Sequence, residues 1–219
     1  MHVIIVTDIF GLTLAIQKLA HTFNQHKNII VTIVDPYKGV KKSFIDEREA
    51  YQTFIVETGH QQYTDEVKKV KNLIDDDIFV LGFSAGASAA WKSAEHNLNA
   101  LTHVIGFYPS QIRNQLNVIP CCPVTMIFPK TEPHFDINQT IKALSKIDNI
   151  SCFKTRYQHG FINPLSINHS AEAEQYFLMK MSKIAKKLNE LMIINELKDS
   201  INTIITDQQA HFIRGDNEH

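Results

Sequence analysis

The sequence is poor in features that mark several large classes of protein. Its 219 residues include only three cysteines, Cys121, Cys122 and Cys152, two of them adjacent. An odd number with an adjacent pair is a poor framework for disulfides and fits a reducing compartment. No apolar run approaches the roughly 20 residues that a membrane-spanning helix requires, and no secretory signal is recognisable. We therefore expect a cytoplasmic protein without a membrane partner.

The sequence has no excess of positive or of negative charge. Lysine and arginine number 22 and aspartate and glutamate 23, for a formal net charge of −1. This balance gives no electrostatic reason to expect a nucleic-acid partner. Metal-ligand spacings such as H-E-x-x-H and C-x-x-C are missing, as is a glycine-rich phosphate loop. The sequence thus predicts no metal and no cofactor, and it does not indicate an oligomeric state.

What the sequence does have is a regular alternation of apolar runs and helical periodicity. Runs rich in β-branched residues and nearly continuous in apolar character are typical of strands buried on both faces of a parallel sheet. They lie at residues 2–7, 29–34, 78–83, 104–107 and 124–128, with a more mixed run at 151–157. Helical patterns lie at residues 12–24, 64–75, 85–96, 136–146 and 171–193. This order predicts an α/β fold with a mostly parallel, doubly wound sheet and helices on both faces.

No repeat, linker or second core is visible in the pattern. Residues 1–206 are therefore predicted to form a single domain. Residues 37–62 are mixed and partly helical, and they are a candidate cap segment beside the site. The polar residues 207–219 are expected to be a disordered tail.

A candidate nucleophile lies between a predicted strand and an alanine-rich predicted helix. Gly82, Ser84 and Gly86 form the pattern G-x-S-x-G at this junction. In a strand–elbow–helix arrangement the serine occupies a sharp, strained turn. The helix N-terminus behind it offers N–H groups and a favourable dipole to a developing oxyanion. The alternative is that Ser84 only caps the helix, but the strand before it and the helix after it favour a nucleophile.

Eleven histidines compete for the role of general base. His159 is favoured because it follows the predicted strand 151–157 and begins a turn. The chain order serine, acid, histidine places the base in a loop of this kind. The alternative is an ordinary surface histidine, and His134 is the nearest rival.

The acid is expected after the predicted strand 124–128, where two carboxylates qualify. Asp136 forms a capping-box pattern with Gln139 and so has a local structural explanation. Glu132 lies in the loop directly beyond the strand and has no competing role. Glu132 is therefore favoured, and Asp136 remains the alternative acid.

Four segments together resemble the dienelactone hydrolase family of α/β-hydrolases. They are residues 8–11 (DIFG), 35–37 (DPY), 82–86 (GFSAG) and 159–164 (HGFINP). They lie in the family's order and spacing, and the resemblance spans about residues 2 to 185. It implies an α/β-hydrolase fold, here without the usual antiparallel hairpin at the N-terminal edge of the sheet.

The resemblance also implies roles for particular residues. Ser84 falls at the family's nucleophile, His159 at its base and Glu132 at its acid. The backbone N–H groups of Ile9 and Ala85 fall where the family forms its oxyanion hole, one after the nucleophile and one in an early loop.

Some positions depart from the family pattern. The founding members carry cysteine where this chain has Ser84, glutamate where it has Asp8, and an arginine for the substrate carboxylate where it has Asn163. The departure at Asn163 argues against dienelactone itself as substrate. Asp8, Phe10 and Tyr108 are expected to line the substrate pocket.

These features predict a carboxylic ester hydrolase with a Ser84–His159–Glu132 triad. Its partner would be a small ester, lactone or thioester, cleaved through an acyl-enzyme intermediate. One alternative is a non-catalytic binding protein with an α/β-hydrolase fold, and another is an acyltransferase that uses the same triad. A distance between Ser84 and His159 beyond hydrogen-bond reach would favour the non-catalytic binding protein.

Overall fold

A parallel β-sheet forms the centre of this computed structural model, which describes residues 1–95, 101–190, 197–207 and 211. Its strands are β1 (His2–Val6), β2 (Ile30–Val34), β3 (Ile78–Phe83), β4 (Leu101–Phe107), β5 (Val124–Phe128) and β6 (Ile150–Lys154). The strand order is β2-β1-β3-β4-β5-β6, and all five neighbouring pairs are parallel. No antiparallel strand extends either edge within the described residues. The predicted fold class is confirmed.

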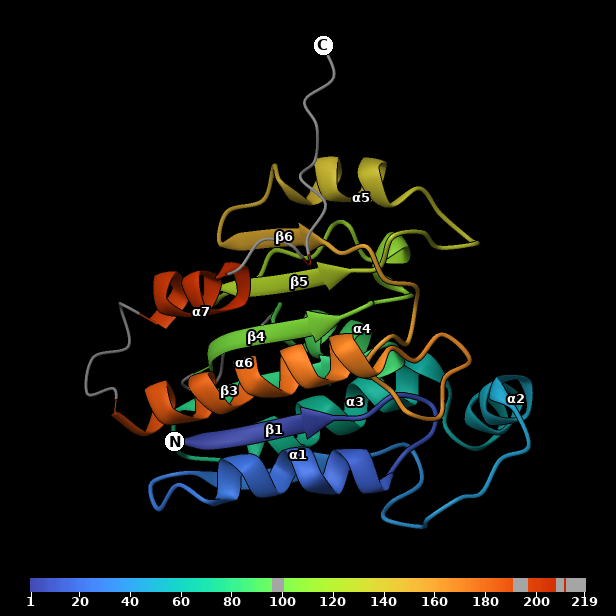
Figure 1. The fold of residues 1–219 in the computed structure, drawn as a ribbon, viewed down its shortest axis with the longest axis horizontal. Coiled ribbons are helices and arrows are strands. Elements are labelled where there is room, and N and C mark those ends of the chain that lie inside the picture. The colour runs from blue at the N-terminus through green and yellow to red at the C-terminus, as the bar shows by residue number, and fades with distance from the viewer. Residues whose placement is uncertain (96–100, 191–196, 208–210, 212–219) are drawn as a thin grey trace.

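Helices cover both faces of the sheet (Figure 1). They are α1 (Leu14–Asn24), α2 (Glu47–Glu57), α3 (Gly59–Asn72), α4 (Ala85–Ser93), α5 (Ile137–Leu144), α6 (Ala171–Glu190) and α7 (Leu197–Thr206), with a short 3-10 helix η1 (Ile112–Asn114). In Figure 1, α1, α6 and α7 lie in front of the sheet, and α3 and α4 lie behind it. None of the helices in the described part of the chain is both long and apolar enough to cross a membrane.

Two hydrophobic clusters explain this layering. Side chains alternate along a strand, so Val3 and Ile5 of β1 pack in the cluster with α1, α6 and α7, whereas Ile4 and Val6 pack in the cluster with α3, α4 and α5. All four side chains are fully buried. Burial on both faces is the reason that the strands are continuously apolar in sequence.

Several boundaries differ from those predicted. β4 begins at Leu101, three residues early, and β6 ends at Lys154 because the chain turns before Tyr157. α3 begins at Gly59, whose φ of +69° separates it from α2. The α7 helix was not predicted, although it buries Ile201 and Ile205 against the core.

The candidate cap segment is described in full in the structure, whereas the expected tail is described only in part. The candidate cap segment 37–62 contains α2 and the start of α3. Of the expected tail, 207–219, only Asp207 and His211 lie within the described residues. His211 stacks on Tyr176, with ring centroids 3.9 Å apart.

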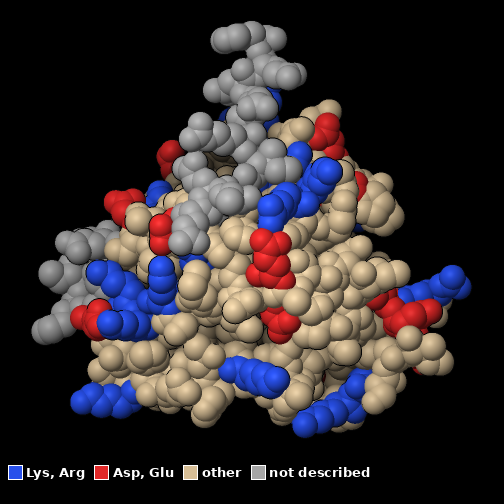
Figure 2. Space-filling model, in the orientation of Figure 1, with Lys and Arg blue, Asp and Glu red and all other residues tan. Residues whose placement is uncertain are grey.

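The C-terminal ends of the parallel strands all meet at one edge of the sheet, on the right in Figure 1. Loops that follow β1, β3, β5 and β6 therefore converge there, as is usual for sites in open α/β sheets. Figure 2 shows acidic and basic side chains interspersed over the face that carries α1 and α6, consistent with the balanced net charge of −1.

Candidate active site

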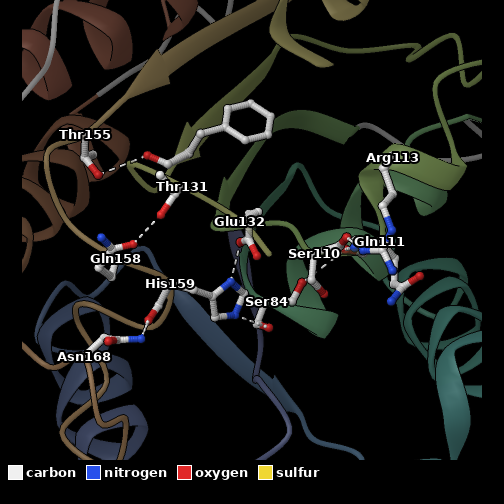
Figure 3. A network of polar contacts seen from close by, with 12 residues as sticks. Ser84, Ser110, Gln111, Arg113, Thr131, Glu132, Thr155, Gln158, His159 and Asn168 are labelled. Atoms are coloured by element: carbon white, nitrogen blue, oxygen red, sulfur yellow. Dashed lines mark hydrogen bonds and ion pairs between the residues drawn. The ribbon is translucent and has the colours of Figure 1, made fainter. Parts of the chain in front are cut away.

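The turn between β3 and α4 holds Ser84 in a strained backbone conformation. Its φ of 50° and ψ of −112° lie outside the backbone regions that residues other than glycine ordinarily adopt. The Ser84 side chain makes no capping bond to α4. Its Oγ lies instead 2.9 Å from Nε2 of His159 (Figure 3). The simple capping explanation therefore does not account for this serine.

Glycines allow α4 to approach the sheet closely at this turn. A Cβ on Gly86 would collide with the backbone carbonyls of Val6 and Thr7, which belong to β1 and the residue after it. A Cβ on Gly82 would lie 2.7 Å from the Cα of Ala87. The G-x-S-x-G spacing is thus required by the packing of helix against sheet, and it brings Ser84 beside the loop after β1.

His159 is held between Ser84 and a buried carboxylate. Its Nδ1 lies 2.5 Å from Oε1 of Glu132, whose side chain is only 5% exposed. Because the carboxylate accepts a hydrogen bond from Nδ1–H, the ring proton stays on Nδ1 and Nε2 is left as the acceptor that faces Ser84. Figure 3 shows these three side chains in one line of contacts. The hydroxyl of Thr131 donates to Gln158 at 2.7 Å and ties the Glu132 loop to the His159 loop.

Asp136, the alternative acid, lies elsewhere. Its Oδ1 accepts from the N–H groups of Asn138 and Gln139 at 2.8 and 3.3 Å, which caps α5. A backbone bridge between Glu132 and Phe135 closes the intervening loop. The structure therefore brings Glu132, and not Asp136, to the imidazole.

Two backbone N–H groups, one in the loop after β1 and one directly after Ser84, have no acceptor within the described part of the chain. They belong to Ile9 and Ala85, whereas the N–H of Phe10 donates to Asp8 Oδ1 at 3.0 Å. The hydroxyl of Tyr37 donates to the carbonyl of Ile9 at 2.6 Å, which holds the peptide between Ile9 and Phe10. Both N–H groups are thus available to an oxyanion.

Asp8 is a buried carboxyl group at the edge of this site. Its Oδ2 accepts from Nδ2 of Asn163 at 2.6 Å, and its Oδ1 accepts from the N–H of Phe10. Burial raises the pKa of Asp8 to about 6, even though both hydrogen bonds and the nearby His159 lower it.

A mostly apolar cavity extends from Asp8 between α1 and α6. Its walls are formed by residues of the loops, the sheet and the two helices, including Phe83, Phe107, Tyr108, Asn163, Phe177 and Met181. The buried ring of Tyr108 also contacts the ring of His159, with centroids 5.0 Å apart. Asp8 and Tyr108 therefore line this cavity together with Phe83, the residue before Ser84, whereas Phe10 packs on Phe44, with ring centroids 6.2 Å apart.

Sequence reasoning missed three supporting contacts. Tyr37 was noted only as part of a motif, and its bond to Ile9 gave no sequence signal. Asn168 donates from Nδ2 to the carbonyl of His159 at 3.0 Å, which supports the histidine loop from behind (Figure 3). Asn163 was recognised as unusual from its place four residues after His159, but its contact with Asp8 was not anticipated.

Comparisons with known proteins agree with the fold. At the sequence level the chain is 34% identical over 128 residues to the Bacillus subtilis protein YczH. That match spans 56% of this chain and 61% of the relative, less than two thirds of its length. The model of the dienelactone hydrolase family matches residues 1–188.

Solved structures of the α/β-hydrolase fold are also similar. A dienelactone hydrolase from Anabaena variabilis gives a TM-score of 0.54 at 11% identity, over 86% of this chain and 83% of that one. Est1E from Butyrivibrio proteoclasticus gives 0.55 at 11% identity, over 85% and 87% of the two chains. At such low identity these likenesses concern the fold alone. The family match, by contrast, takes in all six strands and the loops that follow them, and the chain belongs to the dienelactone hydrolase family.

Proposed function

We propose that this protein is a hydrolase that cleaves a small ester, lactone or thioester with Ser84 as its nucleophile. The observation that carries the proposal is the continuous contact from Ser84 Oγ to His159 Nε2, at 2.9 Å, and from His159 Nδ1 to Glu132, at 2.5 Å. A serine hydroxyl is a weak nucleophile without a base within hydrogen-bond reach. Here the base lies within that reach, and its own orientation is fixed by a buried carboxylate.

In the first half of the reaction Ser84 attacks the substrate carbonyl. His159 Nε2 takes the hydroxyl proton as the bond from Oγ to the carbonyl carbon forms. The carbonyl oxygen becomes an oxyanion and accepts from the N–H groups of Ile9 and Ala85. The tetrahedral species then expels the alcohol or thiol, which receives the proton from His159, and an acyl-serine remains.

In the second half water replaces the leaving group. His159 takes a proton from water, whose oxygen attacks the acyl carbon. Collapse of the second tetrahedral species releases the carboxylic acid, and the proton returns from His159 to Ser84. Glu132 stays ionised throughout, keeps Nδ1 protonated and stabilises the imidazolium.

Neither alternative has an observation of its own in its favour. A non-catalytic binding protein would need no base at the hydroxyl, so the 2.9 Å contact does not support it. Acyl transfer differs from hydrolysis only in which nucleophile accepts the acyl group in the second half. Product analysis with and without added alcohols separates the two reactions.

Hydrolysis of p-nitrophenyl acetate and butyrate by the purified protein tests the proposal. Ser84→Ala should lower kcat by at least about a thousandfold. Ser145→Ala is the matched control, because Ser145 is exposed beyond the end of α5. A fluorophosphonate probe should label the wild type and this control but not Ser84→Ala. Equal turnover by Ser84→Ala and the wild type would rule the proposal out.

A further inference from the structure

The cavity between α1 and α6 has in its wall a carboxyl group, Asp8, that forms no ion pair with a cation among the described residues. Asp8 is only 7% exposed and lines this cavity. It forms no ion pair within the described residues, and its hydrogen-bond donors, Asn163 and the N–H of Phe10, are both uncharged. These neutral donors stabilise the ionised carboxyl without cancelling its charge.

Charged and titratable groups of both signs lie around Asp8, but none forms an ion pair with it within the described residues. His159 and Glu47 are the charged or titratable groups that affect it most strongly, with opposite signs. Glu47 begins α2 and accepts from the N–H of Ile167 at 3.1 Å. Lys18 and Glu174 also line the cavity. The carboxylate of Glu174 lies 2.7 Å from Nε2 of His169.

Arg48 follows Glu47 on α2 and is a basic side chain of the candidate cap segment. It is exposed on α2, and it makes no hydrogen bond or ion pair in the described part of the chain. Arg48 therefore does not neutralise Asp8.

Two exposed aliphatic side chains lie where the candidate cap segment meets the His159 loop. Ile45 is 92% exposed and Ile167 is 88% exposed. The hydrogen bond from Ile167 to Glu47 holds their two segments together. Phe44, next to Ile45, packs on Phe10.

We propose that Asp8 is a specificity-determining residue that admits substrates uncharged beside the scissile carbonyl and disfavours substrates with a carboxylate there. The proposal rests on the function proposed above and names its substrate class. Like charges a few ångströms apart in a site of low polarity repel strongly, since little water is present to screen them. A second carboxylate next to Asp8 is therefore expected to lower kcat/KM by roughly ten- to a hundredfold.

Two esters of nearly equal shape test the proposal. In p-nitrophenyl butyrate the acyl chain ends in a methyl group, and in mono-p-nitrophenyl succinate a carboxylate takes its place. At pH 8 the wild type should prefer the butyrate by at least tenfold in kcat/KM. In Asp8→Asn this preference should fall at least tenfold, mainly because the succinate ester is turned over faster. Asp65→Asn, which removes an equal charge from the exposed side of α3, should keep the wild-type preference.

The wild type alone supplies a second measurement. Because the pKa of Asp8 is about 6, the carboxyl gains a proton as the pH falls from 8 to 5.5. The preference for butyrate should shrink over that range, and this measurement does not depend on the folding of a variant.

The outcomes separate the two proposals. If the wild type does not hydrolyse butyrate, the proposed function fails, and the specificity proposal with it. If butyrate is hydrolysed but the preference is the same in the wild type and Asp8→Asn, or does not change with pH, the role of Asp8 is overturned and the function stands.

Discussion

The amide of Asn163 donates a 2.6 Å hydrogen bond to the carboxyl group of Asp8, 155 residues earlier in the chain. Asp8 follows β1, and Asn163 lies in the turn that His159 begins. The contact therefore joins the loop that carries Ile9 to the loop that carries the base. It does so with a buried carboxyl group, which has a consequence for stability.

Stability should fall as the pH rises through the range in which Asp8 ionises. Its pKa lies near 3.8 in an unfolded chain and is raised to about 6 by burial in the folded one. Between these values the folded state binds more protons than the unfolded state, so the stabilising effect is complete below pH 3.8 and is lost as the pH rises through about 6. A difference of about two pH units corresponds to about 3 kcal/mol.

Asp8→Asn removes this dependence. The free energy of unfolding of the variant minus that of the wild type should become more positive by about 2.5 kcal/mol between pH 4 and pH 8. The test concerns how this difference in unfolding free energy varies with pH and not its size at one pH, because the new amide also alters the contact with Asn163. Urea unfolding at several pH values measures it, and Asp65→Asn serves as the control. A difference that does not vary with pH contradicts a raised pKa for Asp8.

The parallel sheet could be predicted because burial on both faces leaves a clear pattern. Runs such as residues 78–83 and 124–128 are nearly continuous in apolar character, and both are strands with those bounds. Boundaries set by tertiary packing could not be derived in the same way. α7 is short, and its apolar positions become meaningful only once the surface on β4 that it covers is known.

Part of the candidate site could be predicted from the sequence, and part of it could not. Ser84, His159 and Glu132 were found because each follows a recognisable strand, so topology alone brings them to one edge. The bond from Tyr37 to the carbonyl of Ile9 joins loops whose conformations the sequence does not specify. The choice between Glu132 and Asp136 rested on capping chemistry, and in the structure Asp136 does cap α5.

Glu132→Gln should lower kcat far more than it changes KM. The amide of glutamine can donate to Nδ1, which favours the ring tautomer that has its proton on Nε2 and cannot accept from Ser84. A loss of about a thousand- to ten-thousandfold in kcat is expected for a wrong tautomer in an otherwise intact triad. Steady-state hydrolysis of p-nitrophenyl butyrate measures it.

Asp136→Ala is the matched control for the acid. It removes the side chain that caps α5, so it should cost about 1 kcal/mol of stability and leave kcat within twofold of the wild type. If Asp136→Ala lost activity and Glu132→Gln kept it, the assignment of the acid would be reversed.

Gly86→Ala should destabilise the fold at the elbow. The added Cβ would meet the carbonyls of Val6 and Thr7, which are fixed by the sheet, so α4 must move away from β1. A cost of about 3 kcal/mol or more is expected, with loss of activity because Ser84 moves with the helix. Urea unfolding and ester hydrolysis report the two effects.

Gly59→Ala provides the comparison for that substitution. Gly59 has a φ of +69° and open space where a Cβ would lie. Its substitution should cost only about 1 kcal/mol, from backbone strain alone, and should leave activity in place. Equal costs at the two positions would show that close packing at Gly86 is not the constraint.

Cys121 should be the cysteine that reacts first with an alkylating agent. It is exposed, and a hydrogen bond from the Cys122 thiol, helped by the nearby Lys71 ammonium, lowers its pKa from 9.0 to about 7. Burial raises the pKa of Cys152 to about 12. Since the thiolate is the reactive form, labelling by iodoacetamide should reach half its maximal rate near pH 7, at Cys121.

Cys122→Ala isolates the hydrogen bond as the cause. Without the neighbouring thiol the pH midpoint for labelling of Cys121 by iodoacetamide should move up toward the ordinary value of 9.0, because Lys71 supplies the smaller part of the shift. Cys152→Ala should leave the midpoint where it is, since Cys152 lies in β6. Peptide mass spectrometry after timed labelling gives the site and the rate. A wild-type midpoint near 9 would mean that the two adjacent thiols titrate independently, and the order of reactivity would then follow exposure alone.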